Sequence, residues 1–437
     1  MKITPLRACK GRAGLPGDKS ISHRAAILAA LAAGTTKISN FSTSVDCTST
    51  LDCLRQLGVR FTRQNFEVIV EGRGRLGFDA SSGPLNCGNS GSTMRMLAGL
   101  LAGCQSRAVL TGDASLRSRP MTRIIEPLEL MGARIESTGG LPPLTITGTN
   151  ALRALCYELP VASAQVKSAV LIAGLQATGQ TRVIESLGDT RDHTERMLQW
   201  LGVPLEITSV NGKKEIAVDG PAAVEAKDIR VPGDISSASF LIAAAALLAD
   251  SSLEVENVGL NPTRTQFLTT LEALGFAVTI SDFDVRCNEP VGKVVVGGTC
   301  PAERKPQAGA NVLGGALIPQ LIDELPLLAV VGSQTFGGIK ICDAKELRLK
   351  ESDRIRATVT NLRAMGAEVE EFESGLAVSG PTQLHGARLD SAGDHRIAMA
   401  FTVAALVADS ESELVGAECV KISFPNFLEL LESLAVR

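Results

Sequence analysis

The residues best suited to chemistry lie in one short segment near the N-terminus. Residues 16–24 read PGDKSISHR and lead directly into an Ala/Leu-rich run. Pro16 and Gly17 end any helix or strand that precedes them. We therefore expect a helix to begin here, with Ser20 or Ser22 as its N-cap. The N–H groups of the first turn, the helix dipole and the side chains of Lys19 and Arg24 would then converge on one spot that suits a phosphate or a carboxylate. An ordinary capped helix with solvated cations explains this segment equally well when it is taken alone.

Similar polar turns recur before later apolar runs. Residues 89–93 read NSGST with Arg95 one turn on, residues 163–165 read SAQ with Lys167 nearby, and residues 393–396 read GDHR. Ser, Thr, Asn and Asp at such places can simply cap helices. Capping needs no cation, however, and a cation at a helix N-terminus opposes the dipole. We therefore expect several helix N-termini to surround a local anion site.

Three further segments add charged groups. Residues 115–123 hold three Arg in one turn, and residues 322–326 hold two carboxylates before an apolar run, where capping explains one carboxylate but not both. Residues 347–354 interleave cations with carboxylates, and on a helix Lys350 and Arg354 would share one face. A ladder of surface salt bridges explains that spacing as well.

The elements that must position these residues repeat along the chain. An amphipathic helical pattern, a Gly and a β-type run recur, which predicts a glycine C-cap between a helix and a strand each time. These glycines are Gly58, Gly132, Gly202, Gly275 and Gly366. A more apolar helix precedes each pattern, and the six expected apolar helices span 20–33, 90–103, 163–177, 236–249, about 323–331 and 395–408. Helices that are apolar all round are buried on every side, so we expect three of them at the centre of each half with sheets outside. Residues 427–434 predict a last helix that no strand follows.

The two halves of the chain also echo each other. Residues 15–20 read LPGDKS and residues 231–236 read VPGDIS, each before an Ala-rich helix. Together with the regular glycines, this echo favours internal duplication. A chain of 437 residues is too long for one core. We therefore expect one domain over 15–230 and a second over 231–437 plus 1–14, with the site in the cleft between them.

Composition limits the partners and the location. The net charge of −4 gives no general attraction to nucleic acid or to an anionic membrane. The N-terminus lacks the apolar core of a signal peptide, and the longest apolar run, 240–249, is too short to span a bilayer, which predicts a cytoplasmic protein. The ten Cys show no Cys-x-x-Cys pair and no His at metal spacing, so we expect small core hydrophobes and no metal site. They are Cys9, Cys47, Cys53, Cys87, Cys104, Cys156, Cys287, Cys300, Cys342 and Cys419.

Six segments, taken in order, give the chain a resemblance to the 5-enolpyruvylshikimate-3-phosphate synthase family. The segments are 16–24, 88–95, 117–121, 323–326, 349–354 and 394–396. The resemblance implies a mixed α/β (α+β) fold, namely a two-domain inside-out α/β barrel in which each domain has three βαβαββ repeats around buried helices. It also implies transfer of the enolpyruvyl group of phosphoenolpyruvate to the 5-hydroxyl of shikimate 3-phosphate, with release of phosphate and without a cofactor. That reaction belongs to the shikimate pathway, which leads to chorismate and the aromatic amino acids.

The resemblance further implies roles for individual residues. Shikimate 3-phosphate would contact Lys19, Ser20, Arg24, Ser163, Gln165, Asp323 and Lys350. Phosphoenolpyruvate would contact Lys19, Gly91, Arg119, Gln165, Arg354 and Arg396. Asn89 and Ala164 belong to the same substrate-binding set, and the catalytic candidates are Asp323, Glu351 and Lys19. Asp323 and Glu351 would transfer protons.

Two positions depart from the family pattern. Thr190 stands where many members have a Ser that helps to bind the shikimate phosphate, so the hydroxyl survives. Lys421 lies one step out of register with a Lys that grips phosphoenolpyruvate in some members. The predicted set of site residues therefore does not include Thr190 or Lys421.

Two other functions fit parts of the pattern. The sister transferase that acts on UDP-N-acetylglucosamine shares the architecture, but it uses Asn after the first Lys and a Cys in the loop that matches 115–123, where this chain has Ser20 and no Cys. A non-catalytic binder of phosphate ligands would be suggested by loss of Asp323 or Glu351, and both are present. We therefore expect an enzyme with two small-molecule substrates, no nucleic-acid or membrane partner, and a monomeric state.

Overall fold

The chain folds into two compact units with mixed α/β structure. The computed structural model describes residues 1–75, 77–80, 83–298 and 305–437. The terminal unit comprises Met1–Leu15, Gly233–Asp284 and Pro290–Arg437, and the central unit comprises Pro16–Pro232 with Val285–Glu289. The chain passes from one unit to the other at the two Pro-Gly turns, and the short segment Val285–Glu289 belongs to the central unit as well. The expected domain limits stay a prediction.

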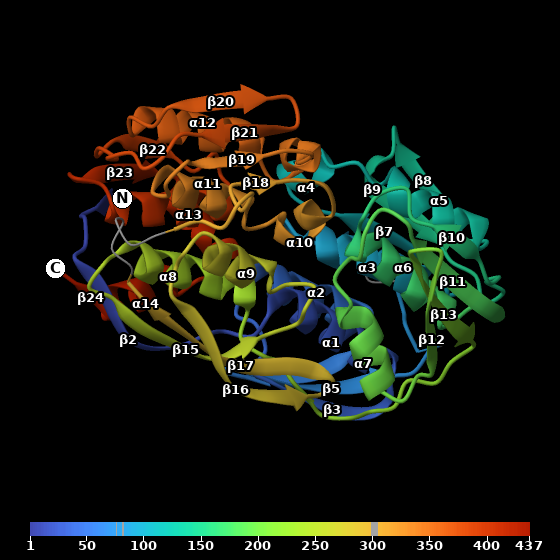
Figure 1. Ribbon diagram of the computed structural model, residues 1–437. Helices are drawn as coiled ribbons and strands as arrows, with labels where there is room; N and C mark the ends of the chain where they lie inside the picture. Colours follow the sequence, from blue (N-terminus) through green and yellow to red (C-terminus); the bar gives the residue numbers. More distant parts are fainter. Residues whose placement is uncertain (76, 81–82, 299–304) are drawn as a thin grey trace. The chain divides into compact units, whose positions relative to one another are not determined.

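The described part of the central unit contains three four-stranded sheets, and Figure 1 labels most of their strands. They are β14-β3-β5-β4, with bounds Ile229–Arg230, Ala33–Ser39, Glu67–Arg73 and Arg60–Gln64; β6-β7-β9-β8, with bounds Leu85–Asn86, Arg107–Thr111, Leu141–Thr147 and Arg134–Thr138; and β10-β11-β13-β12, with bounds Cys156–Glu158, Gly179–Glu185, Lys213–Gly220 and Leu205–Val210. In each sheet the first two strands pair parallel and the others pair antiparallel. The parallel pair needs a crossover connection, which places helices on one face of every sheet.

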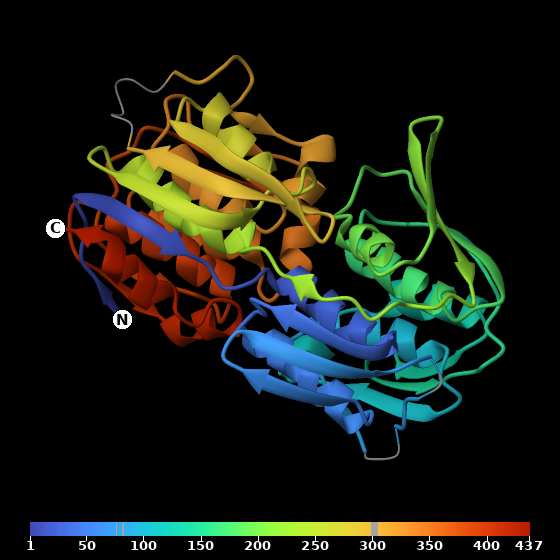
Figure 2. The same cartoon turned by 90° about the horizontal axis from the view of Figure 1, so that it is seen from below.

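The terminal unit holds three more sheets. They are β18-β19-β21-β20, with bounds Val312–Leu313, Ile339–Ile341, Gly375–Val378 and Val369–Phe372; β1-β23-β22, with bounds Lys2–Ile3, Ser412–Val415 and Arg388–Asp390; and β16-β17-β15-β2-β24, with bounds Val278–Arg286, Glu289–Gly297, Ser252–Gly259, Ala8–Gly14 and Ala435–Val436. Figure 2 shows β2, in dark blue, between yellow-green β15 and the red C-terminal segment. The expectation that no strand follows the last helix is wrong, because Ala435 and Val436 pair with the edge of β2.

Apolar helices form the core of each unit, as the sequence predicts. In the central unit these are α1 (Lys19–Leu31), α3 (Gly91–Ala102) and α6 (Ala164–Gly174), and α3 packs against both others. In the terminal unit they are α8 (Ile235–Leu247), α11 (Leu325–Ser333) and α13 (His395–Leu406), which pack on one another. All residues of α8 are buried. Burial on every side explains why these helices carry no polar stripe.

The amphipathic helices end at the predicted glycines. They are α2 (Val45–Gln56), α5 (Thr122–Leu130), α7 (His193–Trp200), α9 (Gln266–Ala273) and α12 (Arg354–Ala364). Gly58, Gly132, Gly202, Gly275 and Gly366 all have positive φ. This left-handed conformation ends a helix and is readily adopted by glycine. The remaining helical elements are α4 (Ala114–Arg117), η2 (Gly315–Leu317), α10 (Ile318–Leu321), η3 (Lys345–Leu349), η4 (Ala417–Ile422) and α14 (Phe427–Leu434).

Two further expectations concern cysteines and membranes. The nine cysteines that the structure describes are free thiols, and Cys300 lies outside the described residues. Five are buried, but Cys156 is exposed and three are half-buried, so the prediction of core positions is wrong for these four. Among the described residues no single helix has the length and apolar content to cross a bilayer, although the bent pair Gly315–Leu321 and Leu325–Ser333 meets both criteria when counted together.

Candidate functional site

The first turns of three helices in the central unit meet around Lys19. Lys19 is the first residue of α1, and its Nζ lies 3.0 Å from Oδ2 of Asp46 in the first turn of α2. The Cys47 thiol donates to the Lys19 carbonyl, and Thr93 Oγ1 of α3 lies 3.5 Å from the Asp46 carbonyl oxygen. The first turns of α1 and α3 thus lie close together, as the sequence predicts, and α2, which was not among the expected helices, joins them; the anion site stays a prediction. The expected caps are wrong, because Asp18, not Ser20 or Ser22, accepts from the Ile21 N–H.

Arg24 lies deeper in the same cluster. Its Nε donates to Thr194 Oγ1 (2.7 Å), its Nη2 to Ser168 Oγ (2.8 Å) and its Nη1 to the Ser20 carbonyl (2.8 Å). Its exposed fraction is 3%. Burial lowers the pKa of Arg24 to about 10, against the opposing charges of Glu195 and Asp18. The guanidinium is therefore a charged donor held by neutral oxygens.

Gln165 connects the starts of α3 and α6. Its amide nitrogen donates to Ser92 Oγ (2.8 Å), and its carbonyl oxygen accepts from Arg95 Nη1. A Cβ on Gly91 would lie 2.8 Å from Arg95 Nη1 and 3.7 Å from Arg119 Nη1. A side chain at position 91 would therefore crowd the Arg95 guanidinium and contact that of Arg119.

Arg119 is fixed beside the same turn. Its Nη2 donates to Asn89 Oδ1 (2.7 Å) and Ser115 Oγ (3.0 Å), and its Nη1 donates to the Asn89 carbonyl (3.3 Å). Asn89 in turn donates to Asp113 Oδ2 (2.7 Å). Ser163, whose Oγ accepts from the Val166 N–H, caps α6, so the expected residues at the start of this helix share one half-buried turn.

A histidine that the sequence analysis did not assign links these turns. His23 Nδ1 lies 2.7 Å from Thr50 Oγ1, which lies 2.6 Å from Thr93 Oγ1, and Thr93 donates to Ser90 Oγ (2.8 Å). Burial, with the charges of Lys19 and Arg24, holds the pKa of His23 well below its ordinary value. His23 is neutral here and connects α1, α2 and α3. Its place within the PGDKSISHR segment was the only sequence signal for this role.

In the terminal unit the expected catalytic residues surround Arg354. Its Nη2 lies 2.6 Å from Glu351 Oε2, its Nη1 lies 3.3 Å from Asp323 Oδ1, and its Nε lies 2.7 Å from Asp394 Oδ2. Burial alone would lower the pKa of Arg354, but the three carboxylates raise it above its ordinary value. One buried guanidinium thus holds both proton-transfer candidates in place.

Arg396 lies against the same acidic residues. Its Nη2 is 3.9 Å from Asp323 Oδ2, its Nη1 is 3.9 Å from Glu324 Oε1, and its guanidinium lies over the Phe240 ring. Glu324 accepts from Ser236 Oγ, and neither Asp323 nor Glu324 makes a capping bond to α11. The expectation that a cap explains one of these carboxylates is wrong, because both face cations instead.

Three sequence expectations in this unit need correction or stay open. Lys350 and Arg354 do not share a helix face, because Lys350 is extended and α12 begins only at Arg354. Lys350 lies 3.7 Å from Glu346, and Arg348 lies 2.7 Å from Asp353, so part of the segment does form the surface salt bridges that were the alternative. Lys421 is exposed in η4, and its role stays a prediction.

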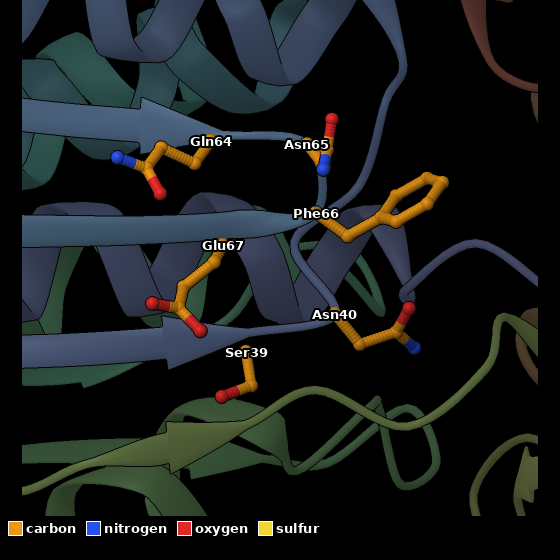
Figure 3. A pocket seen from close by; sticks show the side chains of 6 residues that line it. All are labelled: Ser39, Asn40, Gln64, Asn65, Phe66 and Glu67. Carbon is orange, nitrogen blue, oxygen red and sulfur yellow. The ribbon is translucent and has the colours of Figure 1, made fainter.

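A hollow on the central unit contains none of these residues. It is lined by Ser39, Asn40, Gln64, Asn65, Phe66 and Glu67, where β3 ends and β4 turns into β5. Figure 3 shows the Phe66 ring pointing away from Gln64 and Glu67. The lining residues include no Lys or Arg and one carboxylate, which does not suit an anionic ligand.

Each unit therefore gathers helix N-termini, cations and polar groups at one place, which defines a mixed α/β enzyme for anionic substrates. The profile of the family described as EPSP synthase (3-phosphoshikimate 1-carboxyvinyltransferase) matches residues 3–431. A protein of Salinibacter ruber named 3-phosphoshikimate 1-carboxyvinyltransferase is 47% identical over 99% of each chain, and one of Koribacter versatilis with the same name is 48% identical over 100% of this chain and 99% of its own. The solved EPSP synthase of Acinetobacter baumannii superposes with a TM-score of 0.84 at 37% identity, over 100% of this chain and 98% of its own. The chain belongs to the EPSP synthase family.

Proposed function

We propose that this chain transfers the enolpyruvyl group of phosphoenolpyruvate to the 5-hydroxyl of shikimate 3-phosphate and releases phosphate. Its family is described by that activity, and relatives that match it over nearly their full length carry the same name. The observation that carries the proposal is the cluster around Arg354, where an anion-binding cation contacts both Asp323 and Glu351. Two acid–base groups on one cation suit a reaction that must add and then remove a proton.

The proposed binding residues form two overlapping sets, one for each substrate. Shikimate 3-phosphate takes its phosphate contacts from Lys19, Ser20 and Arg24 and further contacts from Ser163, Ala164, Gln165, Asp323 and Lys350. Phosphoenolpyruvate takes its contacts from Lys19, Gly91, Arg119, Gln165, Arg354 and Arg396, with Asn89 holding Arg119. Cations with fixed hydrogen-bond partners support this assignment, because preorganised donors cost no reorganisation when the anion arrives.

The chemistry is an addition followed by an elimination. C3 of phosphoenolpyruvate takes a proton, and the 5-hydroxyl loses its proton as its oxygen attacks C2. The tetrahedral intermediate then loses a proton from C3 as the C2–O bond to phosphate breaks, which forms the enol ether and inorganic phosphate. We assign Asp323 to the hydroxyl and Glu351 to C3, and each positioned group contributes about 10² to 10⁴-fold to the rate.

The finer architecture and the setting belong to the same proposal. Four of the described sheets share one pairing pattern, a parallel pair followed by two antiparallel pairs, and five glycine caps recur along the chain. Both observations support six βαβαββ repeats, three around each set of buried helices, as in an inside-out barrel. The reaction requires groups from both units, as expected for a site in an interdomain cleft. The monomeric state and the cytoplasmic location stay predictions.

One assay tests the proposed function. Phosphate release from phosphoenolpyruvate is measured with shikimate 3-phosphate, with UDP-N-acetylglucosamine, and with neither. We expect release only with shikimate 3-phosphate. Release that requires UDP-N-acetylglucosamine would identify the sister transferase. No release in any of the three assays, together with retained binding of shikimate 3-phosphate, would identify a ligand binder.

A further inference from the structure

A buried ion triad beside Arg24 has no part in the reaction described above. Lys167 Nζ lies 2.6 Å from Glu195 Oε1 and 3.1 Å from Glu185 Oε1. The side chains of Lys167, Glu185 and Glu195 are 0%, 1% and 2% exposed. Burying charges is costly unless they are paired, and here two carboxylates share one ammonium. A cluster that costs stability in this way needs a reason in terms of function.

Lys167 and Glu195 each lie next in sequence to a residue that contacts Arg24, one of the proposed ligands of the substrate phosphate. Lys167 lies on α6, whose first turn holds Ser163 and Gln165, and Glu195 lies in the first turn of α7. Thr194, which precedes Glu195, accepts from Arg24 Nε, and Ser168, which follows Lys167, accepts from Arg24 Nη2. The residues on either side of the ion pair thus hold the Arg24 guanidinium.

Counting protons fixes the direction of these hydrogen bonds. Ser168 Oγ donates to the Ala164 carbonyl (2.6 Å), so in the 2.6 Å contact between Ser168 and Thr194 the proton comes from Thr194. The protons of both hydroxyl groups are then used in these two bonds, so both hydroxyl oxygens act as acceptors toward Arg24. A guanidinium carries five N–H donors, and three of those of Arg24 are used within the described part of the chain. Two remain to bind a phosphate.

Glu185, the third residue of the triad, accepts the hydrogen bonds of Thr190. Its N–H and its hydroxyl both donate to Glu185 Oε1, and it is 5% exposed. A hydroxyl has a single proton to give, so Thr190 cannot also donate to a phosphate while it donates to Glu185. In this arrangement Thr190 anchors the loop before α7 through Glu185, and its contact with the substrate phosphate stays a prediction.

We infer that Lys167 is a positioning residue for shikimate 3-phosphate, which neutralises Glu195 so that the Arg24 guanidinium stays directed at the substrate phosphate. Without the ammonium, the buried carboxylate of Glu195 would be unpaired and would attract the Arg24 guanidinium, on which its charge already acts. The inference rests on the proposed function, because it takes the ligand of Arg24 from there.

A charge cycle of variants tests the inference. The dissociation constant of shikimate 3-phosphate is measured by calorimetry for the parent, Lys167→Met, Glu195→Gln and the double variant. Lys167→Met should weaken binding by about 10-fold to 100-fold, the range for one lost charge-assisted contact. The double variant, which restores the net charge of the cluster, should return to within about threefold of the parent, as should Glu195→Gln. The KM for phosphoenolpyruvate should change little in all of them.

A matched control separates this effect from general loss of an ion pair. Arg182→Met breaks the 2.7 Å pair with Glu215 on the neighbouring strand of the same unit. It should leave the dissociation constant unchanged.

Several outcomes would overturn the inference. A double variant that binds more than about tenfold weaker than the parent would show that Lys167 acts by packing alone, and this holds even if Lys167→Met fails to fold. Normal affinity in Lys167→Met would also exclude it. If the parent itself binds no shikimate 3-phosphate, the proposed function fails instead.

Discussion

Two arginines at the same depth, one in each unit, have opposite electrostatic surroundings. Arg24 and Arg354 are 3% and 2% exposed. The hydrogen bonds of Arg24 go to hydroxyl and carbonyl oxygens, and burial lowers its pKa to about 10. Arg354 contacts three carboxylates, and these outweigh the effect of burial and raise its pKa.

This difference separates binding from chemistry. A guanidinium held by neutral groups keeps its charge for an incoming phosphate. A guanidinium surrounded by carboxylates instead fixes those carboxylates, and two of them are the proton-transfer candidates Asp323 and Glu351. On the proposed assignment, Arg24 of the central unit serves to attract an anion, whereas Arg354 of the terminal unit also holds the acid–base groups Asp323 and Glu351.

The largest effect is expected where the carboxylates would lose their cation. Arg354→Met should lower the free energy of unfolding by about 3–5 kcal/mol, because it leaves Asp394 buried without its ion pair. Arg119→Met is the matched control in the central unit. Its bonds to Asn89 and Ser115 are to neutral groups, so its loss should cost only about 1–2 kcal/mol. Urea denaturation measures both, and equal losses would remove the contrast between the units.

The next effect concerns affinity. Lys19→Met removes a charged contact to the substrate anions, and it leaves one buried carboxylate, Asp46, without its ion pair. We expect the dissociation constant of shikimate 3-phosphate to rise by about 10-fold to 100-fold, as for one charge-assisted hydrogen bond. Calorimetric titration checks this value. Binding as tight as that of the parent would remove Lys19 from the site.

A smaller effect should appear on acidification. The pKa of His23 is depressed by burial and by Lys19 and Arg24, so the folded state binds fewer protons than the unfolded chain. Its contribution to stability is complete above the unfolded pKa of about 6.5 and decreases as the pH falls below it, by at most about 1.4 kcal/mol per pH unit.

A variant isolates this contribution. His23→Gln should unfold with a weaker dependence on pH between about 6.5 and 5 than the parent, in urea titrations at each pH. The same slope in both proteins would show that neither burial nor the charges of Lys19 and Arg24 depress the pKa of His23 in the folded state.

The smallest effect is expected at Gly91. A Cβ there would lie 2.8 Å from Arg95 Nη1, which is the far end of a flexible side chain and can move. Gly91→Ala should therefore raise the KM for phosphoenolpyruvate by about threefold to tenfold and change the free energy of unfolding by less than about 1 kcal/mol. Gly14→Ala, where a Cβ would meet nothing within 4 Å, is the control and should leave that KM unchanged.

Local patterns in the sequence predicted most of the framework. The buried helices and the glycine caps follow from periodicity and from backbone conformation, which neighbouring residues determine. The cap of α1 was missed because Asp18 and the serines of the same segment can all cap, and only the folded turn selects Asp18. The strand β24 was missed because its two residues are too few to show a pattern.

The partners of the charged residues could not be predicted in this way. Lys167 was noted beside a helix start, but its carboxylates lie 18 and 28 residues further along the chain. Likewise Glu324 meets Ser236, which lies 88 residues earlier. Spacing in sequence decides which residues share a helix face, whereas tertiary packing decides which buried charges meet.

The most direct test of the division between binding and chemistry is the shikimate 3-phosphate affinity of Glu351→Gln. The substitution keeps the shape of the side chain and removes its ability to transfer a proton. We predict a dissociation constant within about twofold of the parent by calorimetry, in protein whose kcat has fallen by about 100-fold or more. A tenfold weaker dissociation constant, or a kcat near that of the parent, would contradict the account.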